Sequence, residues 1–286
     1  MKQRLIFHVG HSAGFYSEFN NMVLAILYCR RHDIDFELYS KDANFGQGKG
    51  WTDFFQPFCK ETINPIHHYI NQRYEGPKGG NRKRLLDAYK IVHPHTFLTH
   101  DLWNDFRHIS NTEMSPDEAQ KAAGDIVSEI YRFNDVTLAE INALMQKVTL
   151  EEPFIGFHVR GGDKIAENQL YNVESYVRKA EQMTDIRTGF VSSDDYRNVE
   201  EMRKRFPKWK FVSLTEESSL GYQQNAFNAA DKMSRRHDLI NMLASMEYLC
   251  KAEMTFCTYS SNVGEFLGMR MGDRAIGIDY QNWMIW

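Results

Sequence analysis

The chain has 286 residues, of which 42% are hydrophobic and 25% are charged, and its formal net charge is −4. Such a composition is ordinary for a globular protein, and the small negative charge offers no long-range attraction to nucleic acid or to an anionic membrane. No apolar run is long enough for a transmembrane segment, and the first residues lack the apolar core and cleavage site of a signal peptide. We therefore expect a cytoplasmic protein, or a soluble part of a longer chain. Peripheral membrane association stays open, and nothing indicates an oligomeric state.

The first half begins with a strand, a glycine-containing turn, a helix and a second strand, an order typical of α/β domains. Further along, Ser115 has the features of an N-cap, with Pro116 at the first helical position and Glu118 completing a capping box. The expected elements are strands at 5–9 and 36–39 and helices at 15–32 and 116–148, the last with a break near 134.

The second half alternates strands with helices, which predicts a parallel sheet covered on both faces. Residues 150–153 look like a linker, so we expect two domains, 1–150 and 151–286. The expected strands are 154–159, 189–192, 210–214, 254–259 and 275–278, and the helices are 173–182, 196–206, 235–251 and 261–271. Ligands bind outside the carboxyl ends of strands in such sheets, so the residues that follow each strand are the informative ones.

The strand at 154–159 ends in an unusually polar segment, in which His158 and Arg160 share one face. Arginine binds phosphate through two donors of fixed geometry, and Lys164 adds a second positive charge. Asp163 can orient either cation. A strand end closed by an Arg–Asp salt bridge explains this segment equally well when it is taken alone.

Two more strand ends carry polar residues. Asp194 and Asp195 follow one strand, where adjacent carboxylates indicate a cation site, a hydroxyl-binding site or the cap of the next helix. Ser260 and Ser261 follow another strand and open a helix, whose N-terminus suits a phosphate or is simply capped. Together the three ends favour a diphosphate site over three independent caps.

Other motifs are weak or absent. The sequence contains no Walker A motif, no dinucleotide-binding glycine motif after a strand and no nucleophile elbow. The pair His67–His68 lacks further ligands at metal-binding spacing, so no metal site is expected.

At the same strand ends the chain resembles the α1,6-fucosyltransferase family, within the wider fucosyltransferase superfamily. The family's His-x-Arg-x-x-Asp-Lys segment is matched at 158–164, its Thr-Asp-Asp segment at 193–195, and its Cys-Thr-Phe-Ser-Ser segment at 257–261. In the first half, residues 48–57 are similar to the family's Gly-Trp-x-x-x-Phe-x-Pro stretch. The matches keep the family's order and span most of the chain.

The resemblance implies a GT-B fold, with two Rossmann-like domains facing a cleft, and inverting, metal-independent transfer of fucose from GDP-fucose to a carbohydrate acceptor. The first domain would form the acceptor side and the second the donor side. His158 would contact guanine, and Arg160 and Ser261 the diphosphate. Glu167 would be the general base and Tyr176 a donor-site residue. Both lie one position earlier than the corresponding family residues. A single deletion between Lys164 and Glu167 brings both into register with the family.

Two departures from the family pattern matter. Gly161 stands where the family usually has a second arginine. The aspartate that reads guanine in the family aligns with Ser245, and Asp238, two helical turns earlier, is the candidate replacement. Two alternatives therefore stay open: a GT-B transferase that uses another nucleotide sugar, and a non-catalytic module that binds a nucleotide or a glycan.

Overall fold

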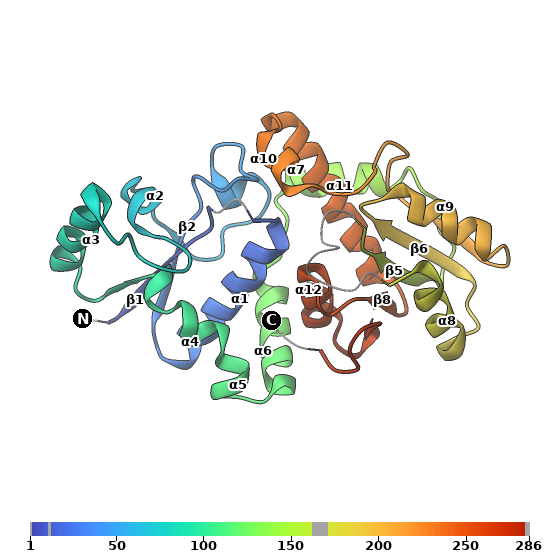
Figure 1. Cartoon of the computed structure of the whole chain (residues 1–286), viewed down its shortest axis with the longest axis horizontal. Coiled ribbons are helices and arrows are strands. Elements are labelled where there is room, and N and C mark those ends of the chain that lie inside the picture. The colour runs from blue at the N-terminus through green and yellow to red at the C-terminus, as the bar shows by residue number, and fades with distance from the viewer. Residues whose placement is uncertain (1, 11–12, 162–170, 284–286) are drawn as a thin grey trace. The chain divides into compact units, whose positions relative to one another are not determined.

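The computed structural model describes residues 2–10, 13–161 and 171–283, and it divides into two compact units, 1–134 and 135–286. Each unit is a parallel β-sheet with helices packed against it (Figure 1). No described helix is long and apolar enough to cross a membrane.

The first unit contains a four-stranded sheet in the order β3-β2-β1-β4, with every pair parallel. Leu5 of β1 lies opposite Phe36 of β2, and four of the five β1 residues are buried because helices cover both faces. The strands are β1 (Arg4–His8), β2 (Asp35–Tyr39), β3 (Lys60–Glu61) and β4 (Thr96–Leu98).

Helix α1 (Phe15–Arg31) is the main buried helix of this unit, and the capping box between Ser115 and Glu118 begins α6 (Pro116–Ile130) as the sequence predicts. The chain leaves helical geometry after Ile130 and resumes it at Asp135, which confirms the expected break. The remaining elements of the unit are η1 (Gly50–Asp53), α2 (Ile66–Ile70), α3 (Gly80–Val92), η2 (Thr99–Asp101), α4 (Trp103–Arg107) and α5 (Ile109–Thr112).

The second unit has a five-stranded parallel sheet in the order β7-β6-β5-β8-β9. Its strands are β5 (Ile155–Val159), β6 (Thr188–Ser193), β7 (Lys210–Val212), β8 (Thr255–Cys257) and β9 (Ala275–Gly277). Its helices are α7 (Asp135–Met145), α8 (Val173–Met183), α9 (Tyr196–Arg205), α10 (Gln224–Ala229), α11 (Lys232–Lys251) and α12 (Asn262–Met271), with the turn η4 (Gly272–Arg274).

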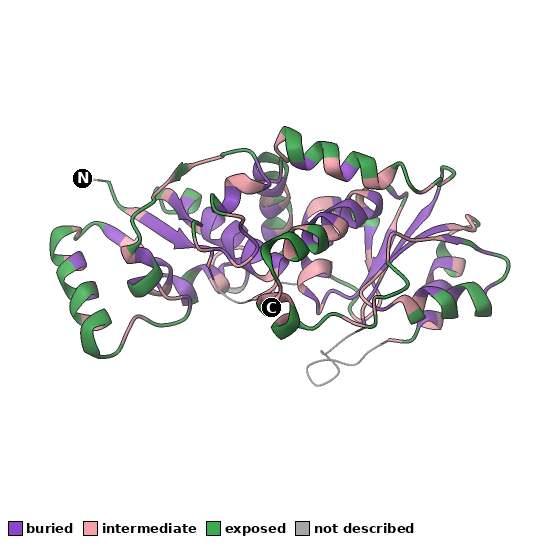
Figure 2. Ribbon diagram, turned by 90° about the horizontal axis from the view of Figure 1, so that it is seen from above, coloured by how far each residue is buried: buried purple, intermediate pink, exposed green. Residues whose placement is uncertain are grey.

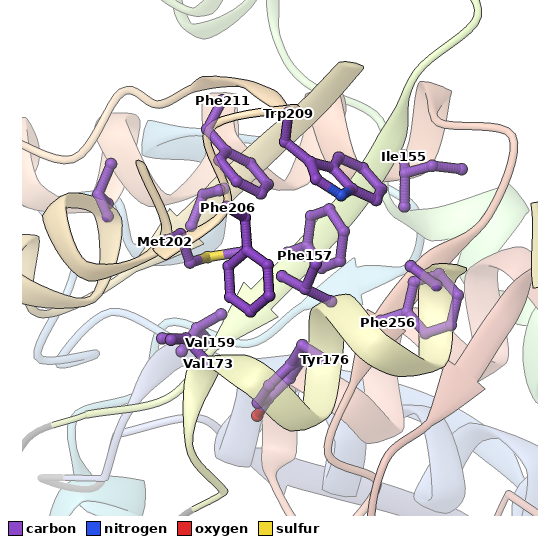
Figure 3. Packing of buried hydrophobic residues seen from close by; sticks show 14 residues of the cluster. Ile155, Phe157, Val159, Val173, Tyr176, Met202, Phe206, Trp209, Phe211 and Phe256 are labelled. Atoms are coloured by element: carbon purple, nitrogen blue, oxygen red, sulfur yellow. The ribbon is translucent and has the colours of Figure 1, made fainter. Parts of the chain in front are cut away.

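Alternate residues of β5 point to opposite faces of this sheet. Phe157 and Val159 belong to a buried cluster with side chains of α8 and α9, which Figure 3 shows around Phe157. On the other face, Gly156 lies against Leu249 of α11. Most strand residues are buried, and most helices have one buried and one exposed side (Figure 2), whereas α1 is buried along most of its length and α10 has no buried residue.

The expected strands and helices of both halves are present, with ends shifted by a few residues. The compact units divide at 134/135, earlier than the expected boundary at 150. The reason is that α7 packs against α11, so the helix before the expected linker belongs with the second unit.

Candidate functional site

The order in which strands are added to the second sheet reverses between β5 and β8. From β5 the chain proceeds outward through β6 and β7, and from β8 it proceeds the other way to β9. Ligands of open parallel sheets bind outside the carboxyl ends of the two strands at such a switch point. His158 and Arg160 stand at the end of β5, and Ser260 and Ser261 follow β8, so the structure brings these two predicted strand ends side by side.

His158 lies in a confined position on the face of β5 opposite Phe157 and Val159. Its Nδ1 atom is buried and has no hydrogen-bond partner among the described residues. Burial, with the nearby positive charge of Arg160, lowers the pKa of His158 to about 3. The imidazole is therefore neutral at physiological pH and keeps an unused polar atom for a ligand.

Arg160 is partly buried and directly follows β5. Within the described part of the chain, no acidic side chain forms an ion pair with its guanidinium. The salt bridge with Asp163, which the sequence left open as an explanation, lies outside the described residues. Lys164 and Glu167 lie outside them as well. An arginine without a carboxylate partner at a strand end is suited to an anionic ligand.

Asp194, at the end of β6, connects the first and second strand ends. Its Oδ1 accepts a hydrogen bond from the backbone amide of Gly161 at 2.7 Å, and its Oδ2 accepts one from the amide of Tyr222 at 3.2 Å. Burial raises the pKa of Asp194, whereas these amides and the charge of Arg160 lower it, and the balance is a raised pKa. Asp194 holds the backbone next to Arg160 and does not point a free carboxylate at solvent.

Asp195 is the N-cap of α9. Its Oδ1 accepts a hydrogen bond from the amide of Arg197 at 3.0 Å, and both carboxylate oxygens pair with the Arg197 guanidinium. That side-chain pairing lowers the pKa of Asp195. Of the uses that the sequence left open for Asp195, helix capping is the one the structure displays.

The segment after β8 is tightly bound to its own surroundings. The amide of Ser260 donates to Asp279 at 2.9 Å. The hydroxyl of Ser261 donates to the carbonyl of Thr258 at 2.8 Å and accepts from the amide of Gly264 at 3.0 Å, which caps α12. The positive end of the α12 dipole therefore lies at the switch point, while the Ser261 hydroxyl itself is already engaged.

Tyr176 of α8 lies beside the ends of β5 and β8. It is buried within the cluster of Figure 3, and its hydroxyl approaches the Thr258 side chain and the Arg160 backbone. Burial raises the pKa of that hydroxyl. Asp238 is exposed on α11, beside the His237–Glu216 pair, and the Ser245 side chain is buried on the same helix.

No group of three His, Cys, Asp or Glu side chains that could hold a metal ion occurs in the described residues. The site instead offers a guanidinium, a helix N-terminus and an imidazole at one sheet edge. These groups favour a ligand with negative charge and a planar polar part, which is the chemistry of a nucleoside diphosphate.

Solved fucosyltransferase structures share this architecture. The chain matches fucosyltransferase NodZ from Bradyrhizobium with a TM-score of 0.56 and 13% identity, over 94% of this chain and 93% of that chain. It also matches FUT1 of Arabidopsis thaliana, solved with GDP, with a TM-score of 0.52 and 10% identity, over 96% of this chain and 72% of that chain. The fold is therefore of the GT-B class of glycosyltransferases.

The family follows from the sequence match. Residues 34–267 match the model of the alpha-(1,6)-fucosyltransferase N- and catalytic domains, so the chain belongs to that family. A curated relative, the alpha-(1,6)-fucosyltransferase of Drosophila melanogaster, is 24% identical over 283 residues. That alignment covers 91% of this chain but only 42% of the relative, so the chain spans less than half the length of that protein.

Proposed function

We propose that the chain is a fucosyltransferase that moves fucose from GDP-fucose to a hydroxyl of a carbohydrate acceptor with inversion at the anomeric carbon. The observation that carries the proposal is Arg160, a cation at the β5–β8 switch point with no carboxylate partner among the described residues. Membership of the α1,6-fucosyltransferase family supports the choice of fucose and GDP. The NodZ enzyme was solved after soaking with GDP-fucose, which supports the same donor.

In this proposal the second unit binds the donor. The Arg160 guanidinium and the N-terminal end of α12 stabilise the negative charge that develops on GDP as the bond to fucose breaks. His158, neutral and with no partner for its Nδ1 among the described residues, receives a hydrogen bond from guanine or its ribose. Asp194 keeps Gly161, and therefore Arg160, in place. Ser261 contributes as the cap that orients α12, with its diphosphate contact made through the helix start.

The resemblance assigns Glu167 as the base that accepts the proton of the attacking hydroxyl, and it assigns Lys164, Asp163 and Tyr176 to the donor site. These assignments stay proposals, as do the guanine-reading role of Asp238 and the placement of the acceptor on the first unit. No metal is required, because Arg160, Lys164 and the helix dipole supply positive charge at the diphosphate. The cytoplasmic location likewise stays a prediction.

The donor is tested by thermal unfolding of the full chain with GDP, UDP or ADP. A ligand at about 100 times its Kd adds about 2.7 kcal/mol to the free energy of unfolding, so only the cognate diphosphate should raise the Tm substantially. Stabilisation by UDP or ADP instead of GDP would identify a GT-B transferase with another donor.

The reaction is tested by incubating the protein with GDP-fucose and a panel that contains chitin oligosaccharides and an N-glycan core, with and without EDTA. We expect GDP release and a fucosylated product in both conditions. Stabilisation by GDP without turnover on any acceptor would favour the non-catalytic binding module, a reading that Gly161 in place of arginine keeps open.

A further inference from the structure

The first unit has a switch point of its own. Its sheet order places β1 next to β4, while β2 and β3 extend the other way. His8 is the last residue of β1, and Asp42 follows the end of β2 by a few residues. A hydrogen-bonded series of polar side chains occupies this carboxyl edge, where a parallel sheet is expected to bind a ligand.

Hydrogen bonds connect these side chains, and Asp42 accepts from the two histidines. Nδ1 of His8 donates to the carbonyl of Asn71 at 2.6 Å, and Nε2 of His8 donates to Oδ1 of Asp42 at 2.8 Å. Oδ2 of Asp42 accepts from Nδ1 of His68 at 2.5 Å. Because a carbonyl and a carboxylate can only accept, the imidazole nitrogens are the donors in these contacts, and His68 donates to Asp42 through Nδ1.

The arrangement is held rigidly by the sheet. The amide of His8 donates to the Thr99 hydroxyl at 2.8 Å, and the side chain of Asn71 donates to the carbonyl of Ile6 at 2.8 Å. Gly10 lies so close to the His8–Asp42 hydrogen bond that an added Cβ would be 2.0 Å from Nε2 of His8. A glycine is therefore required where the chain leaves β1.

The hydrogen-bond partners of Asp42 favour its charged, carboxylate form. Burial would raise the pKa of Asp42, but the hydrogen bonds from His8 and His68 and the electrostatic attraction of their rings lower it below its ordinary value. Glu18 lies near His8 and pairs with Arg73 at 2.9 Å, so its charge is already compensated. Asp42 is thus a fixed carboxylate that orients the two imidazoles.

His68 is the surface member of this hydrogen-bonded series. Its side chain is 53% exposed, whereas those of His8 and Asp42 are 5% and 21% exposed. Since Nδ1 is used, the lone pair of Nε2 is available, and no described residue binds it. The neighbouring Tyr69 is 45% exposed, and its ring centroid lies 4.9 Å from that of His68. A hydrogen-bond acceptor beside an exposed aromatic ring matches a sugar, which presents hydroxyls at its edge and C–H groups on its face.

We propose that Nε2 of His68 accepts a hydrogen bond from a hydroxyl of the carbohydrate acceptor, that Tyr69 supports the face of that sugar, and that Asp42 is a positioning residue which fixes the His68 ring. This acceptor subsite rests on the proposed transferase function for its role, but it is built entirely from the first unit. It therefore has a test that does not depend on donor binding.

The experiment uses the full chain and two readouts: steady-state transfer from GDP-fucose to chitin oligosaccharides and the N-glycan core, and saturation-transfer NMR of the same oligosaccharides without donor. We expect His68→Ala to raise the acceptor KM at least about tenfold, the cost of one hydrogen bond of about 1.4 kcal/mol. The KM for GDP-fucose and the Tm increase with GDP should not change. Asp42→Asn should raise the acceptor KM in the same direction, and Tyr69→Phe should retain acceptor binding that Tyr69→Ala loses.

The matched control is His32→Ala. His32 is also an exposed histidine paired with a carboxylate, Glu113, at 3.0 Å, but it follows the C-terminal end of α1 and precedes β2. We expect no change in either readout. Acceptor binding by His68→Ala within twofold of wild type would overturn the inference, as would wild-type protein that binds no oligosaccharide. Failure of GDP to stabilise the wild type would count against the proposed donor and leave the NMR comparison as a valid test.

Discussion

The carboxylate of Asp194 accepts a hydrogen bond from the backbone amide of Gly161, at 2.7 Å. This contact joins the ends of β5 and β6 and holds the residue next to Arg160. The same close approach leaves little room for a side chain at Gly161. A Cβ at Gly161 would lie 2.9 Å from Cβ of Asp195 and 3.1 Å from Oδ1 of Asp194.

Adding a side chain at Gly161 should therefore disturb the site. We expect Gly161→Ser to lower the free energy of unfolding by about 1–3 kcal/mol, the usual cost of overpacking, and to weaken stabilisation by GDP. Thermal unfolding with and without GDP measures both. Gly79→Ser is the matched control, since a Cβ at Gly79 meets no atom within 4 Å. Equal behaviour of the two variants would show that the close approach is unimportant.

Removal of the Asp194 carboxylate should take away the acceptor that it offers to the backbone amides of Gly161 and Tyr222. We expect Asp194→Ala to lower the free energy of unfolding by about 1–3 kcal/mol and to reduce GDP affinity because Arg160 loses its fixed position. Chemical denaturation and GDP titration test this. Asp185→Ala, at an exposed aspartate, should do neither. A stable Asp194→Ala variant with wild-type GDP affinity would contradict the positioning role.

Arg160 should dominate donor binding. A charge-assisted hydrogen bond contributes about 1.5–3 kcal/mol, so Arg160→Ala should weaken GDP binding roughly 10- to 100-fold and abolish detectable transfer. Arg160→Lys should recover part of the affinity, because lysine keeps the charge but not the paired donors. Isothermal titration with GDP is the measurement, with the exposed Arg132→Ala as control. Near-normal turnover by Arg160→Ala would show that Arg160 does not bind the donor.

His158 should make the fold sensitive to acid. Its pKa is lowered from 6.5 to about 3 by burial and by Arg160. The unfolded chain therefore binds a proton below pH 6.5 that the folded chain refuses, and stability falls as the pH decreases through this window. Relative to His158→Gln, the wild type should lose about 1.4 kcal/mol of unfolding free energy for each pH unit. Urea unfolding from pH 7 to 4.5 tests this, and a constant difference between the two proteins would refute it.

Alanine substitutions of the two serines after β8 should differ in their effect on the free energy of unfolding. Ser261 caps α12, so Ser261→Ala should lower the free energy of unfolding by about 1 kcal/mol and weaken GDP binding indirectly through the helix start. The backbone amide of Ser260 donates a hydrogen bond to Asp279 at 2.9 Å, and loss of the hydroxyl leaves that bond in place. Ser260→Ala should therefore have a smaller effect on stability. Thermal unfolding of both variants checks the order, and the reverse order would exclude the capping explanation.

The sequence predicted elements of both units well because each signal is local. The helical spacing that starts α8 and the apolar run of β5 need only a few neighbouring residues, as does the capping box of Ser115 and Glu118. The unit boundary shifted because α7 packs on a helix far away in the sequence, which local composition does not reveal. The polar cluster of His8 and Asp42 was not predicted, although a polar residue before a glycine turn at a strand end was its visible signal.

The sequence by itself determined the α/β class, the alternation of strands and helices in the second half, and the polar residues that end β5, β6 and β8. Only the tertiary structure decided that β5 pairs with β8, that Asp194 reaches Gly161, and that His8, Asp42 and His68 form one hydrogen-bonded chain. The physical reason is that strand order and side-chain partners join residues distant in the sequence, through packing that no local pattern encodes. The segment around Arg160 thus predicted an anion site from its residues alone, while its geometry came from the neighbouring strands.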